Sequence, residues 1–189
     1  CLPEEVYFTS GGTEANNLAI LGTARLHGKG HIITSKIEHP SVLNPVRHLE
    51  SVGFRVTYVG VDAECRVSAA EVGNSITKDT ILVTIMHSNN ETGTLQPVEE
   101  IREICADRGV TFHSDTAQSV GKMPVSAFAD MLTVVSHKFY GPKGIGAIYI
   151  KKGLKLSPIL FGAGHERGMR AGTENVPGIA GLGKACEIA

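Results

Sequence analysis

An apolar run leads directly into a polar turn in residues 131–144, MLTVVSHKFYGPKG. The first five residues have the length and hydrophobicity of a short buried strand, and the glycines and proline that follow mark a turn. This order places Lys138 just beyond the end of the strand. We expect apolar surroundings to remove part of its hydration, which would make the amine a nucleophile toward a carbonyl or aldehyde. The alternative is an ordinary solvated surface lysine.

The same order of apolar strand, polar tip and helix recurs along the chain. Strands are predicted over 6–10, 31–35, 55–59, 80–86, 110–114, 131–135 and 145–150. Helices are predicted over 15–24, 42–51, 68–75 and 98–107. This alternation is typical of an α/β fold with three αβα layers, in which helices cover both faces of a mostly parallel sheet.

Length, composition and charge fit one domain or a large piece of one. The chain has 189 residues, of which 42% are hydrophobic, and a formal net charge of -1. Because no basic block is present, neither nucleic acid nor an anionic membrane surface is expected as a partner. No apolar run approaches the roughly 20 residues of a membrane-spanning helix.

The four cysteines are scattered and show no CxxC spacing. This distribution favours a reducing compartment, and it argues against a metal site or a disulfide framework. The cytoplasm is the default location, because any organelle-targeting segment would lie upstream of Cys1, and none of these cysteines is expected to be a catalytic thiol.

Polar side chains follow the predicted strands at the ends where parallel sheets bind ligands. The turn before the first helix offers free backbone N–H groups and a hydroxyl to an anion. These tips carry Thr13, His39, Asn90, Asp115, Gln118 and Lys138. A helix cap or a turn residue is the simpler interpretation of Thr13, His39, Asn90 and Asp115. A dinucleotide site is the weakest alternative, because no GxGxxG fingerprint follows the first strand.

A phosphorylated aromatic aldehyde with a protonated ring nitrogen would use all of these groups. Lys138 would bond the aldehyde, while Asp115 would pair with the ring nitrogen and keep it protonated. Thr13 would help to hold the phosphate, and His39 would stack on the ring. A lysine together with a carboxylate at the ring nitrogen is the expected signature of pyridoxal 5'-phosphate.

The chain resembles the cysteine desulfurases and the related selenocysteine lyases, in the aminotransferase class V branch of fold-type I pyridoxal phosphate enzymes. Six motifs in the family's order carry this resemblance over essentially the whole chain. They are TSGGTEANNL (9–18), EH (38–39), NNETG (89–93), DTAQ (115–118), SHKFYGPKG (136–144) and HERGMRAGTEN (165–175).

The resemblance implies a role for each matching position. The phosphate would be bound by Gly12, Thr13 and His137, and by Thr173 from the neighbouring subunit of a homodimer. His39 would stack on the ring and shuttle protons, and Lys138 would act as the base. The other ring contacts would come from Asp115, Asn90 and Gln118. Where the family often has a phosphate-binding serine, this chain has Val135, so Ser136, one place later, is the candidate.

The activity implied by the resemblance is a pyridoxal-phosphate-dependent cysteine desulfurase. Such an enzyme converts L-cysteine to L-alanine and passes the sulfur, as a persulfide, to an acceptor or scaffold protein, for example for iron-sulfur cluster assembly. On this interpretation residues 1–189 are the cofactor-binding large domain, and the N-terminal segment and the C-terminal small domain with its cysteine loop are absent. We therefore expect the chain alone to bind cofactor at most. Selenocysteine lyase and a non-catalytic truncated product without cofactor remain alternatives.

Overall fold

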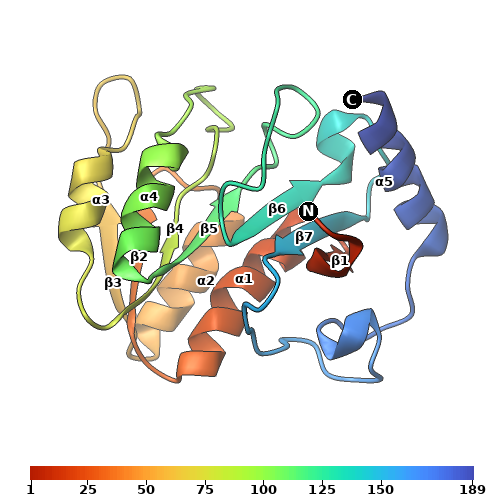
Figure 1. Cartoon of the computed structure of the whole chain (residues 1–189), viewed down its shortest axis with the longest axis horizontal. Coiled ribbons are helices and arrows are strands. Elements are labelled where there is room, and N and C mark those ends of the chain that lie inside the picture. Colours follow the sequence, from red (N-terminus) through yellow and green to blue (C-terminus); the bar gives the residue numbers. More distant parts are fainter.

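The computed structural model describes all residues, 1–189, and confirms the alternation of strands and helices (Figure 1). The strands are β1 (Val6–Thr9), β2 (His31–Ser35), β3 (Arg55–Val59), β4 (Thr80–Thr84), β5 (Thr111–Asp115), β6 (Met131–Val135) and β7 (Gly146–Ile150). The α-helices are α1 (Gly12–His27), α2 (Pro40–Ser51), α3 (Ala69–Ser75), α4 (Val98–Arg108) and α5 (Val176–Ile188). Three short 3-10 helices are η1 (Pro3–Glu5), η2 (Ser136–Phe139) and η3 (Glu166–Gly168).

One predicted strand is too long by two residues. The sequence predicted a strand over 80–86, whereas β4 ends at Thr84. The backbone N–H of Met86 donates to the carboxylate of Glu38 instead of to a neighbouring strand. Ile85 and Met86 are nevertheless buried, which explains why hydrophobicity alone extended the prediction.

The seven strands form one sheet in the order β1-β7-β6-β5-β4-β2-β3. The pairs β2–β3, β2–β4, β4–β5 and β5–β6 are parallel, and β7 is antiparallel to both β6 and β1. All strands except β7 therefore point the same way. Their carboxyl ends meet at one edge of the sheet, where α/β proteins bind ligands.

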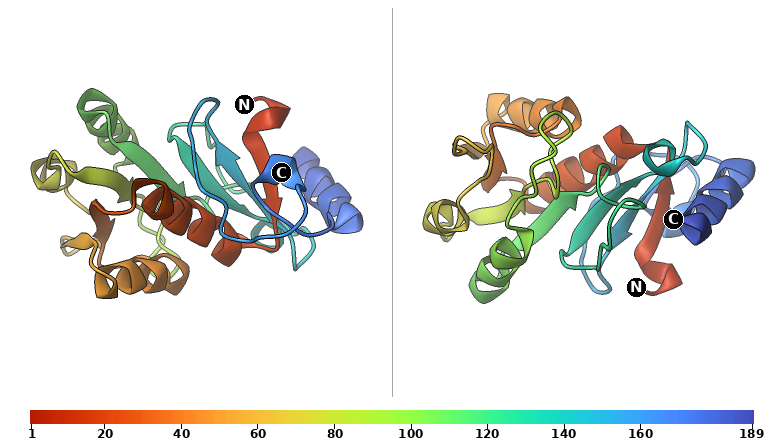
Figure 2. Two further views of the ribbon diagram at one scale, coloured as in Figure 1. Left: turned by 90° about the horizontal axis from the view of Figure 1, so that it is seen from below. Right: turned by 90° about the horizontal axis from the view of Figure 1, so that it is seen from above.

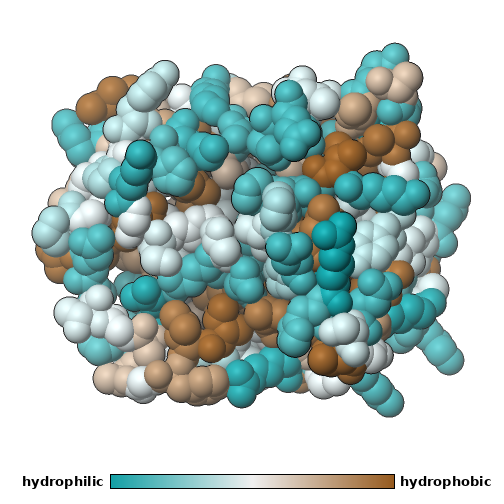
Figure 3. All heavy atoms as spheres, turned by 180° about the vertical axis from the view of Figure 1, so that it is seen from behind, coloured by the Kyte–Doolittle hydropathy of each residue, from teal (hydrophilic) through white to brown (hydrophobic).

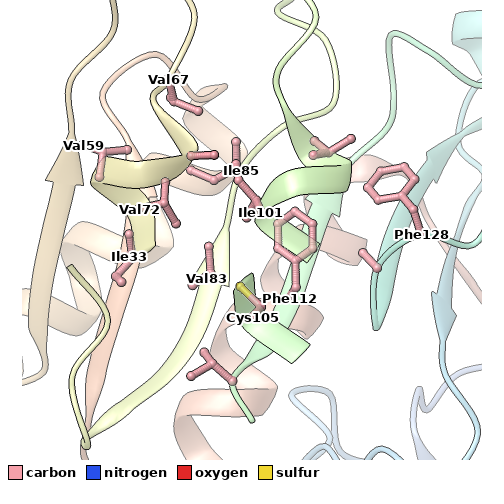
Figure 4. Close-up of a cluster of buried hydrophobic side chains, with 14 of the residues drawn as sticks. Ile33, Val59, Val67, Val72, Val83, Ile85, Ile101, Cys105, Phe112 and Phe128 are labelled. Atoms are coloured by element: carbon pink, nitrogen blue, oxygen red, sulfur yellow. The ribbon is translucent and has the colours of Figure 1, made fainter. Parts of the chain in front are cut away.

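Helices cover both faces of this sheet, as the sequence predicted (Figure 2). One core packs α1 and α2 against strand residues such as Ile32, Leu82 and Met131. The other core packs α3 and α4 against the opposite face, with Val83 and Phe112 at its centre (Figure 4). Because side chains alternate between the two faces of a strand, the neighbours Leu82 and Val83 lie in different cores.

A third cluster joins α5 to the turn that follows β6. Leu182 and Ala185 of α5 pack with Phe139 of η2 and with Ile145 and Ala147 beside it. On the face opposite to the view of Figure 1, apolar side chains gather in several separate areas between hydrophilic ones (Figure 3). None of the helices combines the length and apolar character needed to cross a membrane.

Candidate functional site

A pocket of about 290 Å³ lies at the edge of the sheet where the parallel strands end. Most of its lining residues are polar or glycine. Eight of the ten predicted site residues line it: Gly12, Thr13, His39, Asn90, Asp115, Gln118, His137 and Lys138. The other lining residues are Ser41, Met86, Ser88, Ala117 and Val135. The fold therefore brings the tips of five separate strands into one pocket.

Lys138 is carried by η2, directly after β6. Phe139 is 3% exposed and anchors this turn in the core with α5. The turn ends at Tyr140 in a left-handed conformation, with φ of 69°. Lys138 itself is exposed and lines the pocket. The expectation of apolar surroundings was therefore wrong for this chain, because the pocket around the amine is polar and open to solvent.

The first turn of α1 forms one side of the pocket, with Gly12 and Thr13 on the wall. Helix geometry leaves its first backbone N–H groups without intrahelical acceptors, and the positive end of the helix dipole favours an anion. Gly12 is required at this point because a Cβ atom would lie 2.5 Å from Cγ2 of Val135. Glu14 does not line the pocket, since its carboxylate binds the guanidinium of Arg170 at 2.7 Å. No carboxylate of the first turn therefore competes with a bound anion.

Asp115 is the last residue of β5 and is 7% exposed. The backbone N–H of Ala117 donates to its Oδ1 at 2.9 Å, and Nδ2 of Asn16 donates to its Oδ2 at 2.7 Å. Burial raises the pKa of Asp115, while these two hydrogen bonds and the positive charges of His39 and Lys138 oppose the rise. A cationic nitrogen in the pocket would favour the ionised form further. The site therefore presents a fixed carboxylate suited to such a partner.

His39 combines the two roles that the sequence left as alternatives, helix cap and pocket residue. It is the N-cap of α2, and its Nδ1 accepts the backbone N–H of Ser41 at 3.1 Å. The hydroxyl of Ser41 lies 2.8 Å from the same nitrogen. The imidazole is exposed and lines the pocket. Capping thus holds the ring where it faces a ligand.

The adjacent asparagines after β4 have different roles. Asn89 is buried, and its Oδ1 accepts the backbone N–H groups of Glu91 and Thr92, each at 2.9 Å. Its Nδ2 donates to the carbonyl of Ile37 at 3.0 Å. Asn89 therefore builds the turn and ties it to the segment before His39, which leaves Asn90 on the pocket wall.

Two predicted cofactor-binding residues do not line this pocket. Ser136 is fully buried, and its hydroxyl has no hydrogen-bond partner. It packs so tightly against Gly141 that a Cβ atom there would overlap Ser136 Oγ, so the structure does not support Ser136 as a ligand. Thr173 lines a separate pocket of about 110 Å³ with Ser10 and Arg170. Its predicted contact lies in a neighbouring subunit, which a single chain does not test.

Sequence reasoning missed two residues: Asn16, which binds Asp115 from behind the pocket wall, and Ser41, which lines the pocket and binds His39. Asn16 is fully buried in α1. Helical spacing places it on the same face as Ala19 and Ile20, and a polar side chain on an apolar face is the signal that could have revealed it. Ser41 gives no such signal, because a serine near a helix start is common in any protein.

Comparison with known proteins gives one consistent result. A family model described as aminotransferase class-V matches residues 2–189. The chain is 51% identical over 191 residues to the cysteine desulfurase IscS of Dictyoglomus turgidum, covering 98% of this chain and 48% of that protein. It is 53% identical over 191 residues to the cysteine desulfurase IscS of Methanosarcina thermophila, and the match covers 98% of this chain and 47% of that protein. The chain thus spans about half the length of the curated relatives that it matches.

Solved structures show the same likeness. The structure described as SspA in complex with cysteine superimposes with a TM-score of 0.95 and 46% identity, covering 99% of this chain and 56% of that one. A structure described as a NifS-like protein gives a TM-score of 0.96 and 42% identity, and the match covers 99% of this chain and 53% of that one. The sheet and its helices therefore belong to an architecture that these proteins share.

Proposed function

Because this chain belongs to the aminotransferase class-V family, we propose that it is the cofactor-binding part of a pyridoxal-phosphate-dependent cysteine desulfurase. One observation carries the proposal: Lys138 and the buried Asp115 line a single pocket together with the first turn of α1. An amine, a carboxylate and an anion-binding helix start are the groups that pyridoxal phosphate requires. The names of the relatives, which are cysteine desulfurases, support the choice of reaction.

The lining residues fit this cofactor by their chemistry. The backbone N–H groups at Gly12 and Thr13, with His137, would bind the phosphate. When bound, pyridoxal phosphate supplies an aldehyde for the amine and a protonated ring that withdraws electrons. Asp115 would hold the proton at the ring nitrogen, and His39 would lie against the ring. Hydrogen bonds to the ring oxygen would come from Asn90 and Gln118.

Lys138 has a second role in this proposal. Once substrate cysteine occupies the pocket, Nζ of Lys138 would take the proton from the α-carbon of the substrate. His39 would move protons at the rim of the pocket, since an imidazole can both accept and donate a proton. The cofactor half of the chemistry is thus supplied by residues of this chain.

The sulfur-accepting half is proposed to lie outside residues 1–189. The relatives are about twice as long as the part of them that this chain matches. We place the persulfide-forming cysteine in that remaining part, and we expect the chain alone not to turn over cysteine. A cytoplasmic homodimer that hands sulfur to an acceptor or scaffold protein completes the proposal. The four cysteines of this chain, all unpaired, are consistent with a reducing compartment.

The first experiment tests cofactor attachment. Purified chain would be mixed with pyridoxal phosphate, reduced with borohydride, digested and analysed by mass spectrometry. The proposal expects one modified peptide, with the added mass on Lys138, and no such peptide from Lys138→Ala. An Asp115→Asn variant should bind the cofactor more weakly. Attachment spread over several surface lysines would reject the proposal and favour a scaffold without cofactor.

A second experiment tests the substrate. The longest gene product that contains residues 1–189 would be assayed with cysteine and with selenocysteine, by measuring released alanine. Alanine from cysteine, lost in Lys138→Ala, supports a desulfurase. Activity with selenocysteine alone would instead identify a selenocysteine lyase.

A further inference from the structure

A chain of hydrogen bonds runs behind the pocket and connects the two residues proposed to contact the cofactor ring. Nδ2 of Asn16 donates to Oδ2 of Asp115 at 2.7 Å and to Oγ of Ser41, also at 2.7 Å. Oγ of Ser41 lies 2.8 Å from Nδ1 of His39. Asn16 and Ser41 are 0% and 8% exposed, so water does not replace these contacts. The four residues come from α1, α2 and β5 and from the turn before α2.

With Asp115 ionised, the donors and acceptors of these four residues allow one arrangement. Asn16 uses both amide protons, one on Asp115 and one on Ser41, so the Ser41 hydroxyl is left to donate its own proton to His39. Nδ1 of His39 also accepts the backbone N–H of Ser41 and must therefore carry no proton. In the neutral imidazole the proton then sits on Nε2, the nitrogen that remains available to a ligand in the pocket.

The orientation of Asn16 is itself decided by this arrangement. Turning its amide over would face Oδ1 to the carboxylate of Asp115, and two acceptors would then oppose each other. In the observed orientation Oδ1 is buried without a hydrogen-bond partner. A buried carbonyl left unpaired carries a free-energy cost, because it has lost its hydrogen bond to water without gaining another. A side chain held at that cost indicates that the contacts made by Nδ2 matter more to the fold or to the site.

We propose that Asn16 is a positioning residue, which orients the carboxylate of Asp115 and, through Ser41, fixes the ring orientation and tautomer of His39. This inference rests on the proposed function, because it assigns Asp115 and His39 to the same ligand. Asn16 touches no ligand itself and does not line the pocket. It would act by holding Asp115 where a cationic ring nitrogen would bind and His39 where the face of the ring would lie.

The other titratable groups around Asp115 are few. Lys138 faces it with positive charge, as His39 does only when its imidazole is protonated, and the charge of Asp115 in turn contributes to the raised pKa of Glu38. His113, two residues earlier in β5, is held neutral because burial lowers its pKa to about 3. The ionisation of Asp115 can therefore report a substitution of Asn16, because Asn16 itself forms no hydrogen bond to His39, Lys138, Glu38 or His113.

The test begins without cofactor. The backbone N–H of Ala117 donates to Asp115, so its position in proton–nitrogen NMR spectra reports the ionisation of that carboxylate as pH is varied. The Asn16→Leu variant lacks a hydrogen bond that lowers the pKa of Asp115. The midpoint pH at which the Ala117 signal changes position, here called the Ala117 transition, should therefore move to higher pH. Ser41→Ala keeps the Asn16–Asp115 contact, so this variant should leave the Ala117 transition in place and change only the His39 ring nitrogen signals.

The second measurement is pyridoxal phosphate binding to the same proteins. Because Asn16→Leu makes Asp115 harder to ionise and less firmly oriented toward a cationic ring nitrogen, binding should weaken roughly tenfold. Thr23→Val is the matched control, because Thr23 is a buried polar residue of α1 that bonds only to Ala19 of its own helix. It should change neither the Ala117 transition nor the affinity.

Each outcome has a distinct meaning. An unchanged Ala117 transition and unchanged affinity in folded Asn16→Leu would overturn the inference and leave the proposed function intact. If wild-type protein fails to bind pyridoxal phosphate, the proposed function fails, while the Ala117 transition still decides whether Asn16 controls Asp115. Should Asn16→Leu not fold, Asn16→Asp replaces it: this variant has the same size but opposes two carboxylates, and the transition must again move to higher pH.

Discussion

The carboxylate of Glu38 accepts the backbone N–H of Met86 at 3.0 Å and so joins the turns that follow β2 and β4. The hydroxyl of Ser35 donates to the same carboxylate at 2.6 Å. Glu38 precedes His39 in the chain, and Met86 lines the pocket. A buried acid therefore holds together two segments of the pocket wall without facing the pocket itself.

The first prediction concerns the pH dependence that Glu38 gives to stability. Burial raises its pKa to about 8 from an ordinary value of 4.5, although Ser35 and Met86 both donate to it. The folded state therefore binds this proton more tightly than the unfolded state, and the resulting stability is lost as pH rises from 4.5 to about 8. Glu38→Gln can accept from Met86 and donate to Ser35, but it does not titrate.

Urea unfolding of both proteins at pH 4.5 and pH 8 measures this difference. From the lower to the higher pH, the free energy of unfolding of the wild type should decrease. This decrease should exceed that of Glu38→Gln by a few kcal/mol, which is on the order expected for a buried acid. Equal pH dependence in the two proteins would show that Glu38 is ionised in the fold throughout this range.

The second prediction concerns the ion pair between Glu14 and Arg170, whose Nε–Oε1 distance is 2.7 Å. The side chains are only 12% and 21% exposed, so this pair is screened less than a surface pair. It ties the 165–175 segment to the start of α1. A double-mutant cycle with Glu14→Gln and Arg170→Met should give a coupling energy of roughly 0.5–3 kcal/mol.

Acid should weaken the same pair. Burial would raise the pKa of Glu14, but the hydrogen bonds from Arg170 and Ser10 bring it below its ordinary value of 4.5. Its contribution to stability is therefore present above pH 4.5 and is lost as pH falls through the lower folded-state pKa. Glu14→Gln should lose less stability over this acid range than wild type. A coupling energy near zero in the cycle would contradict the prediction.

The third prediction concerns the close approach of β7 to the turn before α1. A Cβ atom on Gly146 would lie 2.8 Å from the Cα of Gly11 and 2.8 Å from the carbonyl oxygen of Val134. Both are backbone atoms that cannot rotate away, so Gly146→Ala should destabilise the protein by about 1–3 kcal/mol and displace the turn before α1. Gly60→Ala is the control, because a Cβ atom there meets nothing within 4 Å. Thermal unfolding of the two variants compares them, and similar melting temperatures would refute the prediction.

The fourth prediction concerns His113, which is fully buried between two threonines on neighbouring strands. Its Nδ1 lies 2.8 Å from Oγ1 of Thr84, and its Nε2 lies 3.1 Å from Oγ1 of Thr133. His113→Leu should destabilise the fold by about 1–3 kcal/mol, because it leaves two buried hydroxyls without their partner. Adding Thr84→Val and Thr133→Val should recover most of this loss. Denaturant unfolding measures the series, and a triple variant no more stable than His113→Leu would contradict the explanation.

Much of the fold and most of the pocket could be predicted from the sequence. The periods of two and of about 3.6 residues follow from backbone geometry, so hydrophobic spacing located every strand of the sheet and the helices α1 to α4. Polar residues after each apolar run then indicated the ligand-binding edge, because parallel strands place their carboxyl ends together. His39, Asp115 and Lys138 were found in this way, and all three line the pocket.

Other features could not be read from local pattern. Lys138 and Ser136 lie two residues apart in η2, yet one is exposed at the pocket and the other is buried under Gly141. Spacing along the chain does not decide this difference in a short 3-10 turn, because the direction of each side chain depends on what packs behind it. The expectation that Lys138 would lose part of its hydration was wrong for the same reason.

The sequence by itself determined the alternating elements, the polar strand tips and the residue types that suit a phosphorylated aldehyde, since each depends on neighbours within a few positions. Only the tertiary structure decided which of these groups meet and what supports them. Asn16 and Asp115 are 99 positions apart and touch because α1 packs across β5. Such a contact depends on the order of strands in the sheet and on the packing of helices over it, and long-range packing has no local period that a sequence could display.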